Sequence, residues 1–156
     1  MAQNKVKNNT APASINSGGE HFIGVIPDVF RWTGWGGKDR FNIAATDKRL
    51  VFDFITDKNP PWDDYPKKKI EEILALNKRN FAIELGQVKS FRFITGESVD
   101  HSCGRHEEVR GEMRIQTPKT KYSFYVSNRH ERAAKETLKK ADIPFEEIRP
   151  ERLTGI

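Results

Sequence analysis

The chain has 156 residues, of which 36% are hydrophobic and 31% charged, a balance that suits one domain large enough to bury its own core. Its single cysteine, Cys103, excludes an intramolecular disulfide, and neither a signal segment nor a long apolar stretch is present, so we expect a cytoplasmic protein. The net charge of +5 favours anionic partners such as nucleic acid, acidic lipid or acidic protein.

The first part of the chain predicts a tail, a strand and a loop. Residues 1–19 are polar and rich in turn-forming residues, and we expect a disordered N-terminal tail because little apolar surface is available to offset the entropy of ordering it. A strand is predicted over residues 21–29, where Pro27 indicates an edge strand or a β-bulge. Residues 32–38 contain three glycines and predict a sharply bent loop with exposed side chains.

The clearest β-hairpin signal comes next. Residues 41–46 and 50–55 are strand-like runs separated by a turn at Asp47, Lys48 and Arg49. Alternate side chains of both runs are apolar and are expected to point inward: Phe41, Ile43, Ala45, Leu50, Phe52 and Phe54. Prolines then interrupt the chain in a surface excursion that ends at Pro66.

The remaining elements alternate between strand and helix. Residues 67–77 have helical spacing, with Ile70, Ile73 and Leu74 on one face, and predict a short helix. Strands are predicted over 81–85 and 88–94, followed by a polar loop over 96–110. A second hairpin, over 111–117 and 122–126, brings the expected total to about seven strands.

A C-terminal helix is predicted to follow the last strand. Ser127 or Asn128 can cap its first turn, with Glu131 placed as in a capping box. Its apolar stripe is narrow and suits packing over a sheet, and it consists of Ala134, Leu138 and Ala141. Pro144 ends the helix, and residues 142–156 are expected to form a loosely packed extension.

Several segments of the sequence resemble bacterial and archaeal members of the pleckstrin-homology-like (PH/GRAM-like) family. The similar segments are GEHFIGVIPDV, FNIAATDKRLVF, NFAIELGQVKSFRF and MRIQTPKTKYSFYVSNRHERAAKETLKK, including a T-D-K-R-L turn over residues 46–50. The resemblance covers residues 20–141. It implies a mainly β fold: a seven-stranded antiparallel barrel or sandwich with a C-terminal capping helix, here with a short inserted helix.

The best candidate binding surface surrounds the first loop. Tryptophans and cations gather there in the sequence: Arg31, Trp32, Trp35, Lys38, Arg40, Lys48 and Arg49. In pleckstrin-homology domains this loop binds phosphoinositide headgroups through a basic residue followed by R-x-R, which Lys38-Asp39-Arg40 resembles in part. Exposed Trp beside Arg favours a protein partner or a second copy of the chain. Anionic lipid at the membrane periphery and, less favoured, single-stranded nucleic acid are the alternatives.

A plainer alternative also stands, in which one tryptophan packs beneath the loop and the charges form a solvated face. Metal binding has only a weak signal: His101, Cys103 and His106 have the spacing H-x-C-x-x-H, with no obvious fourth ligand. The sequence contains no G-x-S-x-G, P-loop, H-E-x-x-H or dinucleotide-binding glycine pattern. We therefore expect a binding module that is not an enzyme and uses no cofactor.

Overall fold

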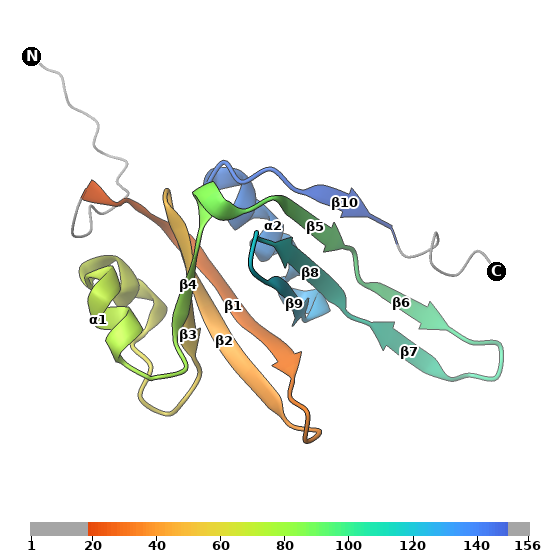
Figure 1. Ribbon diagram of the computed structural model, residues 1–156. Helices are drawn as coiled ribbons and strands as arrows, with labels where there is room; N and C mark the ends of the chain where they lie inside the picture. The colour runs from red at the N-terminus through yellow and green to blue at the C-terminus, as the bar shows by residue number, and fades with distance from the viewer. Residues whose placement is uncertain (1–18, 150–156) are drawn as a thin grey trace, which may run out of the picture.

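The structure, a computed structural model, describes residues 19–149, without the side chain of Val99. Eight strands form one sheet in the order β10-β5-β8-β9-β1-β2-β3-β4 (Figure 1). Their bounds are β1 (Phe22–Trp32), β2 (Lys38–Thr46), β3 (Arg49–Phe54), β4 (Phe81–Glu84), β5 (Ser90–Ile94), β8 (Gly111–Gln116), β9 (Lys121–Val126) and β10 (Glu146–Ile148). Two further strands, β6 (Glu97–Asp100) and β7 (His106–Val109), form a separate hairpin.

The mainly β class is confirmed, but the strand count and the closure of the sheet differ from expectation. The described residues contain ten strands where about seven were predicted. The sheet is mixed because β10 and β5 are parallel, whereas all other pairs of neighbouring strands in this sheet are antiparallel. Its terminal strands, β4 and β10, are not paired with each other, so this part of the chain forms an open, strongly bent sheet and not a closed barrel.

Strand β1 holds the two halves of the sheet together. It pairs with β2 along most of its length and with β9 only at Val29 and Phe30, and the bulge expected at Pro27 is confirmed. The register with β2 shifts between Ile26 and Val29. Asp28 occupies the bulge with a φ of 53°, and its N–H donates to the side-chain oxygen of Asn42 at 3.1 Å.

The hairpin β2–β3 and the C-terminal helix build the main core as predicted. All six alternating side chains of the hairpin join one apolar cluster, with Phe54 only partly buried. Phe52 lies at its centre, stacked on Phe81 at 4.5 Å and on Phe124 at 4.7 Å between ring centroids. Helix α2 (Glu131–Lys140) packs against β1, and its predicted stripe is buried in this core.

The start of α2 is not capped as expected. A 3₁₀ turn over Asn128–His130 precedes the helix, and neither Ser127 nor His130 makes a side-chain cap hydrogen bond. Glu131 has other partners instead: it accepts the backbone N–H of Gly96 at 2.8 Å and the ammonium of Lys135 at 2.9 Å. The predicted capping glutamate therefore ties α2 to the loop after β5.

A second, smaller core lies on the other face of β2 and β3. The predicted inserted helix is α1 (Ile70–Ala75), and a 3₁₀ helix over Trp62–Lys67 precedes it. These two helices cover Ala44 and Val51 with three fully buried side chains: Tyr65, Ile70 and Ile73. The insertion thus shields one face of the sheet (Figure 1).

Two segments predicted as irregular have regular structure. The expected polar loop over 96–110 is mostly the β6–β7 hairpin, which extends away from the sheet (Figure 1). Part of the expected loose extension is strand β10, and Ile143 before it is buried in the main core.

No described helix has the length and apolarity needed to cross a membrane. Nearly all of the predicted N-terminal tail, 1–18, and the end of the extension, 150–156, lie outside the described residues.

Candidate functional site

The β1–β2 turn presents two tryptophans at one end of the sheet. Trp32 pairs with Lys38 in the last rung of the two strands, and the backbone N–H of Thr33 donates to the carbonyl of Gly37 at 2.9 Å to close the turn. Gly36 has a φ of 78°, a conformation that favours glycine. Trp35 at the tip is 98% exposed and Trp32 is 53% exposed. The alternative in which one tryptophan packs beneath the loop is therefore wrong.

Cations and aromatic rings interleave on the outer face beside Trp32. Phe30 stacks on Tyr125 of β9 at 5.4 Å and meets the edge of Trp32 at 5.5 Å. The ammonium of Lys38 lies 4.6 Å from the Phe30 ring centroid and 5.1 Å from that of Trp32, and the guanidinium of Arg110 lies 5.5 Å from Phe30. These cation–π contacts hold the charges against the rings and cover Phe30 almost completely.

Arg31 lies on the opposite side of β1, over the open end of the main core. Its guanidinium is 5.4 to 5.7 Å from the centroids of three core rings: Phe41, Phe81 and Phe124. Asp39 accepts a hydrogen bond from Arg79 at 3.2 Å and forms an ion pair with Arg31 at a nitrogen–oxygen distance of 3.8 Å. Residues of the turn and these ionic groups line a hollow of about 580 Å³ in which Trp35 forms one wall.

Arg40 anchors the β-bulge. Its Nε and Nη2 both donate to the carboxylate of Asp28 at 2.8 Å, a bidentate pair. These hydrogen bonds and the negative charge of Asp28 raise the pKa of Arg40 above its ordinary value. Arg40 is half exposed, so its remaining face is open to a ligand beside Phe30, its partner across the strands.

The structure does not bring Lys48 and Arg49 to this surface. They follow β2 at its far end, and the eight residue steps between Lys38 and Thr46 separate the two ends by about 26 Å. Arg49 is mostly buried there and pairs with Glu20 at 3.0 Å, Glu71 at 3.4 Å and Glu84 at 3.7 Å. Arg49 is therefore a structural residue. The predicted binding surface divides into two distant parts, one at each end of β2.

Four residues of the site come from positions that sequence reasoning did not connect with the loop. Phe30 precedes Arg31 on β1. Arg79, Arg110 and Tyr125 are distant in sequence, and the fold places them beside the loop. We define the tryptophan end by its exposed aromatic and basic side chains: Arg31, Trp32, Trp35, Lys38, Arg40, Arg79 and Arg110. Its five cations outnumber the two carboxylates that pair with them, Asp28 and Asp39, by three.

The H-x-C-x-x-H segment lies at the tip of the β6–β7 hairpin and pairs within itself. His101 Nε2 contacts Glu107 Oε1 at 2.9 Å, and His106 Nδ1 contacts Asp100 Oδ1 at 2.7 Å. The hydrogen bond from His101, with the charge of Arg105, lowers the pKa of Glu107. Within residues 19–149 the structure gathers no group of three His, Cys, Asp or Glu side chains that could hold a metal ion.

Comparison with known proteins adds one weak structural likeness. No family model matches the chain, and no curated protein matches it. The chain is similar to the crystal structure of the C-terminal domain of an unknown protein from Leishmania infantum, with a TM-score of 0.40 and 14% identity. The match covers 79% of this chain and 85% of that one. At this TM-score the likeness carries no argument about fold or function.

Proposed function

We propose that this protein is a non-catalytic binding module with a pleckstrin-homology-like fold that engages a protein partner through the tryptophan end. The fold proposal is supported by the run of antiparallel neighbours β5-β8-β9-β1-β2-β3-β4, followed in the chain by α2. On this interpretation, the β6–β7 hairpin and β10 are additions to a seven-stranded pattern.

The exposure of Trp35 carries the functional proposal. An indole that is 98% exposed at the tip of a hydrogen-bonded turn contributes nothing to the core, yet its burial in a complex would remove a large apolar area from water. Half-exposed Trp32 and the guanidinium groups of Arg31 and Arg79 lie close by. Trp and Arg are the residue types most enriched among side chains that dominate binding energy in protein interfaces.

The charge of the tryptophan end favours an acidic partner over a second copy of the same surface. A two-fold contact between two such ends would place one net positive patch against another, since the same residues face each other across a symmetric interface. Like charges opposed in this way are unfavourable. We therefore expect the isolated protein to stay monomeric at low salt, as light scattering can measure.

Loss of both tryptophans is expected to abolish partner binding. Replacing Trp32 and Trp35 with Ala removes the apolar anchors, and we expect affinity to fall by about 30-fold or more, the effect of removing an interface residue worth 2 kcal/mol. The measurement is a pull-down with purified protein as bait, repeated at low and high salt, followed by titration of the captured partner. Salt should weaken binding because the surface is basic.

Trp62 provides a matched control for that experiment. It is 51% exposed but lies in the 3₁₀ helix before α1, outside the tryptophan end. Trp62→Ala should leave the partner bound, so equal losses in the two variants would indicate nonspecific adhesion of exposed indoles. A partner retained by the Trp32→Ala/Trp35→Ala variant, with circular dichroism unchanged, contradicts the proposal.

Peripheral binding to anionic lipid is a second candidate, favoured by the position of Trp35 at the tip of a turn between cations. Indole rings partition into the membrane interface, and each Lys or Arg near an acidic surface adds about 1 kcal/mol. This candidate predicts sedimentation with vesicles that contain phosphatidylserine and release by salt. Equal sedimentation with neutral vesicles, or binding unaffected by Trp35→Ala, would rule it out.

A further inference from the structure

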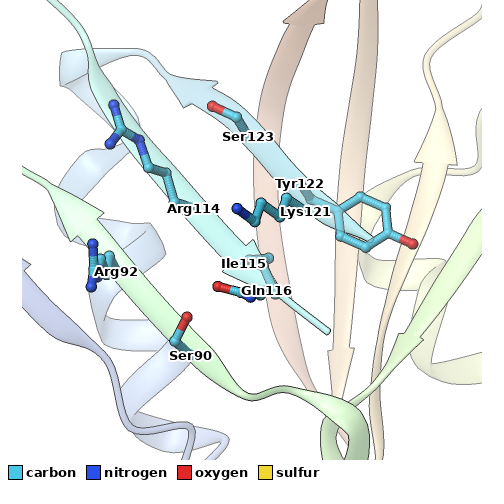
Figure 2. Close-up of a pocket in the computed structure, with 8 residues that line it drawn as sticks. All are labelled: Ser90, Arg92, Arg114, Ile115, Gln116, Lys121, Tyr122 and Ser123. Carbon is cyan, nitrogen blue, oxygen red and sulfur yellow. The ribbon is translucent and has the colours of Figure 1, made fainter. Parts of the chain in front are cut away.

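A second basic site lies on the outer face of β5, β8 and β9. The pairing register places side chains of the three strands on the same face in two alternate rungs, Ser90-Gln116-Lys121 and Arg92-Arg114-Ser123. Together with Ile115 and Tyr122 these residues line a trough of about 290 Å³ (Figure 2). We call it the outer trough.

The lining of the outer trough consists mainly of hydrogen-bond donors. Two guanidinium groups, one ammonium, two hydroxyls and one amide come from its six outward-facing residues, and no carboxylate is among the lining residues. Figure 2 shows Arg92 and Arg114 on one side and Lys121 on the other, while the ring of Tyr122 points away. The trough is therefore complementary in charge and in hydrogen bonding to a compact oxyanion.

Carboxylates outside the trough fix both arginines in place. Glu112 accepts from Arg114 Nε at 3.0 Å and Nη2 at 3.3 Å, and the hydroxyl of Ser123 also donates to it. Glu146 of β10 lies 3.3 Å from Arg92 Nε. Burial acts to raise the pKa of Glu112, but the hydrogen bonds from Arg114 and Ser123 outweigh it and lower that pKa. The glutamate therefore remains a charged anchor for Arg114 at neutral pH.

The remaining donors are available to a ligand. Within the described part of the chain, Nη1 of Arg114 and the terminal nitrogens of Arg92 make no hydrogen bond. Lys121 has no ion-pair partner within the described part of the chain. Three cations facing one small trough, one of them uncompensated, repel each other and would be stabilised by a shared anion.

We propose that the outer trough binds a phosphoryl group, carried by a phosphate monoester or present as free phosphate. A monoester carries between 1.5 and 2 negative charges at pH 7 and three strong acceptor oxygens, which suits the two arginine forks and the lysine better than a carboxylate with two oxygens. A trough of about 290 Å³ is at the small end of the range for ligand pockets, which favours a single phosphoryl group over a nucleic-acid strand.

This site is separate from the tryptophan end. The rung Glu112-Tyr125-Phe30 lies between the trough and Trp32, so the two surfaces share the sheet but no residue. The phosphate proposal therefore does not depend on the proposed function. Trp32→Ala/Trp35→Ala should lose the protein partner and keep phosphate binding, which makes the two failures distinguishable.

NMR titration of the full chain tests the proposal with three probes at constant ionic strength: inorganic phosphate, O-phosphoserine and sulfate. We expect saturable shifts of the Ser90, Arg92, Arg114 and Lys121 amides with phosphate or phosphoserine. Tighter binding of phosphoserine would identify a phosphorylated side chain as the source, and equal binding would identify a free phosphate. Affinity for phosphoserine should fall below about pH 6, where its phosphate dianion takes up a proton and loses one negative charge.

Lys121→Gln is the decisive variant because Lys121 supports no ion pair, so the fold should be unaffected. We expect about tenfold weaker phosphate binding, as for the loss of one hydrogen bond to a charged group. Arg114→Gln should weaken binding at least as much, and Lys67→Gln, an exposed cation far from the trough, should not. Absence of saturation at millimolar phosphate, equal shifts with sulfate, or unchanged affinity in Lys121→Gln overturns the proposal.

Discussion

Replacing Arg49 with Leu is expected to lower the free energy of unfolding by about 3 to 5 kcal/mol, the usual cost of removing one partner of a buried ion pair. The side chain of Glu20 is 3% exposed, and it accepts from Arg49 Nε and Nη2 at 3.0 Å and from the Thr46 hydroxyl at 2.5 Å. Without Arg49 the carboxylate stays buried with no cation. Urea denaturation followed by circular dichroism measures the loss.

Two further variants separate burial of a charge from loss of packing. Glu20→Leu combined with Arg49→Leu removes both charges, and we expect it to be more stable than Arg49→Leu alone, because an apolar pair can replace a buried ion pair. Lys67→Gln breaks an exposed pair with Asp64 and should cost less than 1 kcal/mol. A loss below 1 kcal/mol for Arg49→Leu would contradict the structural role of Arg49 and return it to the candidate binding residues.

Elements with a regular apolar period were predictable from the sequence. The β2–β3 hairpin and the α2 stripe each show one apolar face at the spacing of their backbone, and both join the main core. The β6–β7 hairpin could not be found in this way. Its strands read ESVD and HEEV, with no apolar face, and its described side chains are largely exposed. Strand β10 was missed because three residues carry too short a pattern.

The candidate site was only partly predictable for a different reason. The turn and its tryptophans are local in sequence, so glycines and aromatic residues pointed to them directly. The position of Arg110 over Phe30 depends on the register of β8, β9 and β1, and this register is set by tertiary packing. Lys48 and Arg49 were assigned to the same surface because they are near in sequence, but a nine-residue strand separates them from it. The outer trough likewise combines three strands with no shared local motif.

Replacing Asp53 with Ala is expected to cost about 3 kcal/mol of stability. This carboxyl group is fully buried between β3 and the inserted helices, and accepts from the Tyr65 hydroxyl at 2.6 Å, Asn80 Nδ2 at 2.8 Å and Asn59 Nδ2 at 3.1 Å. The two amides have second acceptors in the carbonyls of Phe54 and Ile73, so the loss falls short of three full hydrogen bonds to a charged group. Urea denaturation measures it, and a cost below 1 kcal/mol would show that this network does not hold the insertion.

The pH dependence of stability gives a second measure of the same network. Burial, then the hydrogen bond and charge of Asp53, raise the pKa of Tyr65 well above the ordinary value near 10. Above about pH 10 the unfolded chain therefore loses this proton while the folded protein keeps it, and stability present at lower pH is lost as pH rises. One such tyrosine lowers the free energy of unfolding by roughly 1.4 kcal/mol between pH 9 and pH 11.

The variant Tyr65→Phe should be less stable at pH 8 by about 1 kcal/mol, and its stability should lack this part of the decline at high pH. Parallel alkaline curves for the two proteins would mean that Tyr65 ionises as freely in the folded state as in the unfolded one.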